Sequence, residues 1–176
     1  MDICGRIKGE NLENTGNAFE IMPVAAEHVP AVLEVYRQCE DFLELGPVPL
    51  ASLEMVLEDL RHSSGMNGLF CGIFVQGEMA GIVDYVPNRH EGRDGTAFLS
   101  LLMIARQWRG AGLGSKVVNA VEREMRRCGA RTVLSGVQAN NPSAIRFWQR
   151  MGYRITGGPD RMPDSTVCFS LEKTLP

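Results

Sequence analysis

The sequence lacks several features that would point to a secreted, membrane-bound or metal-binding protein. No apolar run is long enough to span a bilayer, and the first residues contain no apolar segment of the secretory kind. The cysteines are few, odd in number and never spaced as Cys-x-x-Cys, and the histidines are isolated. This pattern predicts that all five cysteines are reduced thiols: Cys4, Cys39, Cys71, Cys128 and Cys168. We expect a cytoplasmic protein without a bound metal and without membrane attachment.

A strong excess of positive charge is also missing. The chain has 18 Lys and Arg against 21 Asp and Glu, a formal net charge of −3, so it has no broad basic footprint for nucleic acid. With 176 residues, 44% of them hydrophobic, it is large enough for one domain with a sizeable core. We expect a single globular domain over residues 18–176, preceded by a flexible leader over residues 1–17. That leader is polar and aperiodic, and packing of it on the domain or on a partner is the alternative.

Hydrophobic periodicity and turn residues predict an α/β fold with a mixed sheet flanked by helices. The expected order is strand 19–22, helix 25–39, helix 52–61, strands 69–76, 79–86 and 96–105, helix 112–128, strand 131–138, a helix from Pro142 that ends before Gly152, and strands 153–156 and 166–171. The segment 40–51 is expected to be a loop, either a lid that carries substrate contacts or a plain connector. The charged residues of helix 112–128 are expected on its solvated face: Glu122, Arg123, Arg126 and Arg127.

The stretch 97–128 places an apolar strand, a glycine cluster and a helix start in succession. Glycines let a backbone approach a ligand closely, and a helix start presents amides without intrahelical partners. Together they predict an anion site of the kind that binds phosphate. Two nucleotide motifs are excluded by the spacing: G-x-x-x-x-G-K-[ST] does not fit, and the cluster at 110–114 reads G-x-G-x-G rather than G-x-G-x-x-G.

Two motifs carry a resemblance to a known family. RGAGLG at 109–114 matches the Q/R-x-x-G-x-G/A signature of the GCN5-related N-acetyltransferases, and NPSAIRFWQRMGY at 141–153 is similar to that family's N-x-x-A-x-x-(F/L)-Y-x-x-x-G-F segment. Their separation and the order of elements also resemble the family. The resemblance implies an acyl-CoA N-acyltransferase-like fold with a mostly antiparallel sheet, in which strand 96–105 splays from strand 131–138.

The resemblance also implies acetyl-coenzyme A (acetyl-CoA) as acetyl donor. Backbone amides from Arg109 to Ser115 would hold its diphosphate, and the edge of strand 96–105 would pair with the pantetheine arm. An amide of Met103 or Ile104 would face the thioester oxygen as an oxyanion donor. The implied cofactor-binding residues are Leu102, Met103, Ile104, Arg109, Gly110, Ala111, Gly112, Leu113, Gly114, Ser115, Asn141, Ala144 and Trp148.

Two positions depart from the family. Ser100 stands where many members have a glutamate that removes the amine's proton, and Trp148 stands where a tyrosine often protonates the leaving thiolate. An indole N–H does not ionise usefully, so water would have to protonate that thiolate. Asp84 is the first candidate base, because it lies among apolar residues; a structural, hydrogen-bonded acid is the alternative. Weaker candidates are His90, Glu91 and Asp94, and the acids between Glu40 and Glu44 could instead select a cationic amine.

The sequence thus predicts an N-acetyltransferase that moves an acetyl group from acetyl-CoA to a primary amine of a small molecule or peptide, by direct attack in a ternary complex. A non-catalytic acyl-CoA sensor is the alternative, because Ser100 and Trp148 replace the expected base and acid. Acceptor specificity is expected in the loops 40–50 and 87–95. A homodimer is possible, since dimers are common in the family.

Overall fold

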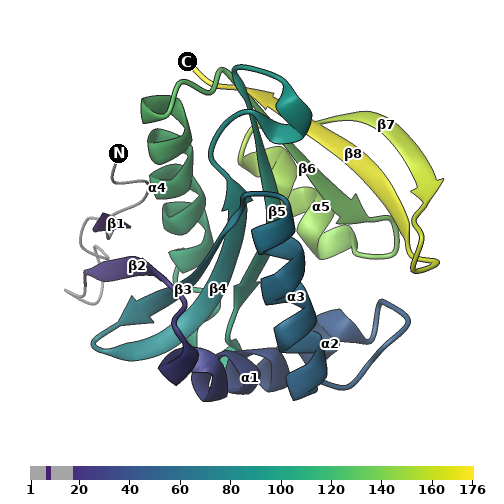
Figure 1. Ribbon diagram of the computed structural model, residues 1–176. Helices are drawn as coiled ribbons and strands as arrows, with labels where there is room; N and C mark the ends of the chain where they lie inside the picture. The colour runs from purple at the N-terminus through teal and green to yellow at the C-terminus, as the bar shows by residue number, and fades with distance from the viewer. Residues whose placement is uncertain (1–6, 9–17) are drawn as a thin grey trace.

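The computed structural model describes residues 7–8 and 18–176 (Figure 1). Within them, an eight-stranded sheet has the order β1-β2-β3-β4-β5-β6-β8-β7. Neighbouring strands are antiparallel except β5 and β6, which are parallel. The strands are β1 (Ile7–Lys8), β2 (Phe19–Pro23), β3 (Leu69–Val75), β4 (Glu78–Val86), β5 (Thr96–Ile104), β6 (Thr132–Gln138), β7 (Arg154–Arg161) and β8 (Val167–Thr174).

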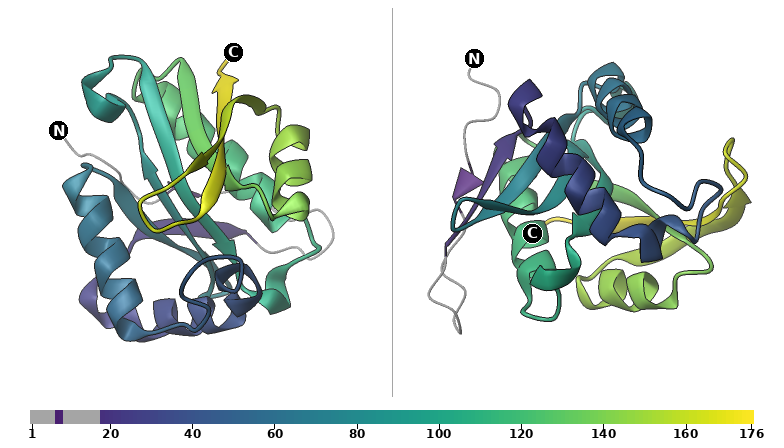
Figure 2. Two further views of the ribbon diagram at one scale, coloured as in Figure 1. Left: turned by 90° about the vertical axis from the view of Figure 1, so that its right-hand side faces the viewer. Right: turned by 90° about the horizontal axis from the view of Figure 1, so that it is seen from below.

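Helices cover both faces of this sheet. They are α1 (Val29–Gln38), α2 (Glu40–Leu43), α3 (Leu53–Gly65), α4 (Leu113–Arg127) and α5 (Pro142–Arg150), with short 3-10 turns at Ala26–His28, His90–Gly92 and Arg106–Trp108. Figure 2 shows α1 and α3 on one face of the sheet and α4 and α5 on the other. In the described part of the chain, no helix combines the length and apolarity needed to cross a bilayer.

Each face of the sheet has its own apolar core. In β4, Val83 packs with Val117 of α4 in one cluster, while its neighbour Ile82 packs with Val32 of α1 in the other. This alternation follows from the pleat, because successive side chains of a strand point to opposite faces. A central strand that is apolar on both sides therefore needs helices on both sides, which gives a three-layer domain.

The expected fold class is confirmed: one α/β domain with a mixed, mostly antiparallel sheet and flanking helices. Some boundaries differ. The short helix α2 begins within the predicted loop, and α3, β7 and β8 all run longer than predicted. Within the expected flexible leader, Ile7–Lys8 pair with β2; the rest of residues 1–17 lies outside the described residues.

One helix position was predicted wrongly. Glu122 was expected on the solvated face of α4 but is only 8% exposed. Its carboxylate accepts hydrogen bonds from the Tyr153 hydroxyl at 3.0 Å and from Lys173 Nζ at 2.6 Å. Because two donors satisfy this carboxylate, its burial between α4 and the C-terminal strands is tolerated.

The pairing of β5 with its two neighbours positions the candidate site. Thr96–Leu99 pair with Thr132–Ser135 of β6, and the register of that pair extends no further. The second half of β5 keeps its pairing with β4 as far as Ile104. One edge of β5 therefore has backbone groups without a strand partner, next to the turn that leads into α4.

Candidate functional site

A cavity of about 790 Å³ opens where β5 and β6 stop pairing. Its walls are the ends of β5 and β6, the start of α4, one side of α5, and residues Cys39–Leu45 around α2. Every residue predicted to bind the acetyl donor lines this cavity except Ala111, which lies between two glycines that do. Two motifs far apart in the sequence are thus brought to one place. The predicted splay of β5 from β6 stays a prediction.

The glycine turn presents a run of unpaired amides. Gly110 and Gly112 have φ values of +84° and +77°, which residues with a side chain rarely adopt. A Cβ at either position would meet no atom within 4 Å. Within the described residues, none of the amides from Gly110 to Ser115 donates to a protein acceptor; the first bond of α4 is from Lys116 N to Gly112 O at 3.2 Å. This geometry suits a diphosphate at a helix N-terminus.

The side chain of Arg109 turns away from these amides. Its guanidinium binds both carboxylate oxygens of Asp41 in α2, at 2.6 and 3.1 Å, and Nε donates to the carbonyl oxygen of Ile104 at 2.7 Å. The hydrogen bond from Arg109 lowers the pKa of the Asp41 carboxyl. Arg109 thus links α2 to the end of β5, and its predicted contact with a phosphate stays a prediction.

The backbone near the end of β5 has one side toward β4 and one toward the cavity. The amide of Ala105 donates to the carbonyl oxygen of Ala80 at 2.9 Å. Because amides of a strand point alternately to its two sides, the amide of Met103 faces β4 and the amide of Ile104 faces away from it. The carbonyl of Ile104 accepts from Arg109 instead of β4, which agrees with this assignment. Of the two candidate oxyanion donors, the geometry favours Ile104.

Helix α5 presents the second motif to the cavity. The Asn141 side chain caps the helix, since its Oδ1 accepts from the amide of Ala144 at 3.0 Å. Trp148 is 7% exposed and packs edge-on against Tyr153, with the ring centroids 4.9 Å apart. Asn141, Ala144 and Trp148 all line the cavity from this helix, so capping and cavity lining coexist at Asn141.

Asp84, the first candidate base, is enclosed. It is 5% exposed and lines neither this cavity nor the one beside it. Its Oδ1 accepts from Ser63 Oγ of α3 and its Oδ2 from Ser100 Oγ of β5, both at 2.5 Å. Ser100 does line the cavity. Asp84 can therefore exchange a proton with a ligand in that cavity only through the Ser100 hydroxyl.

A second cavity, of about 1090 Å³, adjoins the first, and six residues line both: Phe42, Leu101, Met103, Gln138, Asp164 and Thr166. Its walls come from α3, from residues 42–48 of the α2–α3 segment and from the β7–β8 turn. Acidic residues outnumber basic ones in the lining: Glu54, Glu58, Asp59 and Asp164 against Arg61 and His62. Such a lining favours a cationic ligand. Of the two loops expected to set acceptor specificity, 40–50 contributes residues to the lining of both cavities, whereas no residue of 87–95 lines either one. Their role in specificity stays a prediction.

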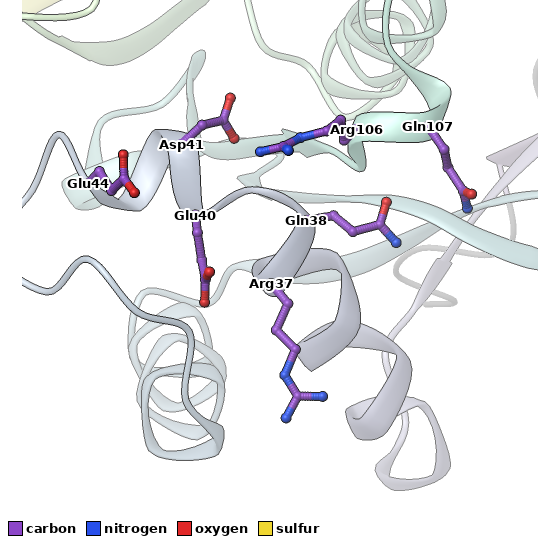
Figure 3. A pocket seen from close by; sticks show the side chains of 7 residues that line it. All are labelled: Arg37, Gln38, Glu40, Asp41, Glu44, Arg106 and Gln107. Carbon is purple, nitrogen blue, oxygen red and sulfur yellow. The ribbon is translucent and has the colours of Figure 1, made fainter.

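The acids of α2 and the residues around it do not line that second cavity. Glu40, Asp41 and Glu44 border another hollow of about 660 Å³, together with Arg37, Gln38, Arg106 and Gln107 (Figure 3). The Glu40 carboxylate accepts a hydrogen bond from the amide of Ala51 at 3.0 Å. Glu40 and Glu44 therefore line neither of the two adjoining cavities, whereas Asp41 also lines the first one. Selection of a cationic amine by these acids stays a prediction.

The weaker candidate bases also lie apart from both cavities. His90 stacks on Phe98 with ring centroids 4.4 Å apart, and burial lowers the pKa of its imidazole. Glu91 and Asp94 pair with Arg93 and Arg89 in the same loop. In the described residues, no group of His, Cys, Asp and Glu side chains is arranged to hold a metal ion.

Asp59 was missed by the sequence analysis. It lies on α3, lines the second cavity, and accepts a hydrogen bond from the Tyr36 hydroxyl at 2.6 Å. Burial raises the pKa of its carboxyl. A signal existed: Asp59 and Ser63 follow Val56 by three and seven residues, the spacing of one helix face. The predicted apolar side of that helix, formed by Leu53, Val56, Leu57 and Leu60, did not include Asp59 or Ser63.

The comparisons with known proteins agree with this geometry. The sequence matches the acetyltransferase (GNAT) family over residues 30–153. It is 26% identical over 117 residues to the spermine/spermidine N(1)-acetyltransferase of Bacillus subtilis (strain 168), covering 63% of this chain and 74% of that protein. The structure of an acetyltransferase from Thermus thermophilus superposes with a TM-score of 0.74 at 23% identity, covering 89% and 97% of the two chains. The PaiA N-acetyltransferase of Thermoplasma acidophilum, solved in complex with coenzyme A, gives 0.63 at 18% identity, covering 89% and 99%. The structural matches show an acyl-CoA N-acyltransferase-like fold.

Proposed function

Because the chain belongs to the acetyltransferase (GNAT) family, whose acetyl donor is acetyl-CoA, we propose that it transfers an acetyl group to a primary amine by direct attack in a ternary complex. The acceptor is a small molecule or a peptide. One observation carries the proposal: the cavity lined by the two family motifs meets an acidic cavity at Leu101 and Met103. A thioester at that junction would be open to an amine from the other side.

On the donor side, the amides from Gly110 to Ser115 would bind the diphosphate, since they lack protein acceptors. The pantetheine arm would lie along the open edge of β5 and hydrogen-bond to the backbone of Leu102, as an added strand does. Asn141 and Ala144 would line its other side from α5.

At the junction, the amide of Ile104 would donate to the thioester oxygen. Negative charge develops there during attack, so a preorganised donor lowers the barrier. Trp148 borders the cavity but does not ionise usefully, so a water molecule would protonate the departing thiolate. A thiol has a pKa of about 8.5, which makes its thiolate a fair leaving group.

An alkylammonium has a pKa of about 10.4 and must lose a proton before it can attack. Asp84 is a candidate base that would act through Ser100. The amine would pass a proton to Ser100 Oγ while the hydroxyl proton moves to Asp84 Oδ2, 2.5 Å away. This relay makes Ser100 a replacement for the glutamate that many family members carry at its position.

The lining of the second cavity bears on the acceptor. Its acids outnumber its bases, which favours an amine that carries more than one positive charge. The similar Bacillus protein is named for spermine and spermidine. We therefore propose polyamines as the first acceptors to test, before amino acids and peptides with a free N-terminus.

Two measurements test the proposed function. Isothermal titration should detect binding of acetyl-CoA, with competition by coenzyme A. Mass spectrometry across an amine panel should detect acetylated product that depends on the protein. Binding of acetyl-CoA without product from any amine would instead support a non-catalytic acyl-CoA sensor. Absence of acetyl-CoA binding would refute both the enzyme and the sensor.

A further inference from the structure

The acidic cavity contains a carboxylate that the proposed reaction has not yet used. Asp59 projects from α3 and is half-buried against α1, where the Tyr36 hydroxyl donates to its Oδ2 at 2.6 Å. Among the residues that the structure describes, Oδ1 of Asp59 accepts no protein hydrogen bond. This oxygen is therefore available to a ligand in a cavity that reaches Leu101 and Met103.

We infer that Asp59 binds the ammonium group of the acceptor and takes its proton before the amine attacks the thioester. The inference rests on the proposed acetyl transfer and assigns its proton acceptor to α3 rather than to β5. Tyr36 acts as a positioning residue, because its hydroxyl donates to the carboxylate while Tyr36 itself does not line the cavity. The route through Ser100 to Asp84 is the competing assignment.

Accessibility distinguishes the two carboxylates. Asp84 has both oxygens occupied by serine hydroxyls and lines neither cavity. Asp59 has one oxygen occupied and lines the cavity that would hold the acceptor. A general base must come within hydrogen-bond reach of the proton that it removes, directly or through one water. Because Asp59 lines that cavity, a ligand there can reach its carboxylate without a relay.

The charges around Asp59 suit a proton acceptor. Burial, the largest effect, raises the pKa of Asp59, and the hydrogen bond from Tyr36 lowers that pKa. The negative charges of Asp84 and Glu58 raise it further, while His62 lowers it. The Tyr36 phenol stays protonated, because burial raises its own pKa. A carboxylate with a raised pKa accepts a proton more readily than an exposed aspartate.

The step balances in atoms and charge. The ammonium R–NH₃⁺ gives one proton to Asp59 Oδ1, which becomes a neutral carboxyl, and the resulting amine attacks the thioester carbon. The C–N bond forms, the C–S bond breaks, and the sulfur leaves as a thiolate. The second proton of the attacking nitrogen reaches the thiolate through water. Asp59 releases its proton to solvent before the next turnover.

The pH profile of kcat, measured with spermidine and acetyl-CoA, separates the two assignments. Asp59→Asn should lower kcat by about 100-fold or more and remove the acidic limb, since a general base contributes about that much. Tyr36→Phe should keep activity and move the acidic limb to higher pH, because it removes a hydrogen bond that lowers the pKa of Asp59. Asp84→Asn should move the limb to lower pH, because it removes a charge that raises that pKa.

Glu34→Gln is the control, since it removes one negative charge from an exposed position of α1 that lines neither cavity. It should keep kcat within about threefold, a change worth less than about 1 kcal/mol. Titration of spermidine alone by calorimetry should also show weaker binding to Asp59→Asn than to the control. Thermal melting should show every variant folded, with Asp59→Asn at least as stable as the wild type at pH 7, because it removes a buried charge.

Two results would overturn the inference. One is a profile in which Asp84→Asn loses the acidic limb while Asp59→Asn keeps it, which assigns the base to Asp84. The other is equal spermidine binding by wild type and Asp59→Asn. If the wild type acetylates no amine, the proposed function fails, and the binding titration still decides whether Asp59 holds an ammonium group.

Discussion

Replacing Gly112 by alanine should weaken both folding and acetyl-CoA binding, whereas replacing Gly114 should weaken neither. The two glycines lie in the same turn and differ in backbone conformation. Gly112 has a φ of +77° and stands directly before α4. Gly114 lies inside the first turn of α4, without a positive φ. The pair therefore tests the backbone geometry of the turn with the smallest possible side chain.

The expected magnitudes follow from that geometry. An alanine in the left-handed region costs about 1–2 kcal/mol, partly offset by about 0.5–1 kcal/mol from a less flexible unfolded chain. The net loss for Gly112→Ala is about 1 kcal/mol, or about 2–4 °C in Tm for a domain of this size. At Gly114, an added Cβ meets Ile104 and Phe147 at 3.6–3.7 Å, an ordinary contact. Alanine there should be neutral or stabilise the helix by up to about 1 kcal/mol.

The affinity for acetyl-CoA should also be lowered by the substitution of Gly112 and not by that of Gly114. The Cβ of Gly112→Ala would enter the open space beside the unpaired amides, so we expect the Kd of acetyl-CoA to rise about tenfold, or about 1.4 kcal/mol. Gly114→Ala should leave the Kd within about twofold, since its Cβ would lie against Ile104 and Phe147 at ordinary contact distance. Calorimetry measures both. Equal Kd values for the two variants would show that the amides of this turn do not hold the diphosphate. A larger loss of Tm for Gly114→Ala would refute the argument from backbone conformation.

Three further predictions concern stability. Glu122→Gln should lower the free energy of unfolding, measured with urea, by about 1–3 kcal/mol, because it leaves the largely buried ammonium of Lys173 without its carboxylate. An unchanged urea midpoint would contradict this. Gly81→Ala should cost about 1–3 kcal/mol by overpacking, since its Cβ would collide with a backbone carbonyl of β5. Asp41→Asn should lower Tm slightly, because the half-exposed ion pair with Arg109 contributes about 1 kcal/mol or less to the free energy of unfolding. The pKa of Asp41 is lowered in the folded state, so this difference should exist at pH 7 and shrink as pH falls below about 4.

The fold was largely predictable because its signals are local. Periodicity and turn residues placed the strands and helices of the central sheet, and the glycine turn before α4 and the Asn-Pro start of α5 were recognised from their own residues. The errors occurred where orientation depends on packing. Leu53, Val56, Leu57 and Leu60 recur at helical spacing and predict one buried side of α3, yet Leu53 and Leu57 are 49% and 42% exposed, and only Val56 of the four is fully buried. Helix propensity predicts that a helix forms, but the sheet decides which face it buries.

The donor side of the site was determined by the sequence itself. It depends on backbone amides at a glycine turn and a helix start, and these arise from residues that are adjacent in the chain. The acceptor side was decided only by the tertiary structure. On that side, Tyr36 and its partner Asp59 are 23 residues apart. Elsewhere in the fold, Lys173 and Glu122 are 51 residues apart, and Arg109 and Asp41 are 68 apart. A side chain's charge and accessibility depend on such distant partners, and their contacts exist only after the sheet and helices have packed.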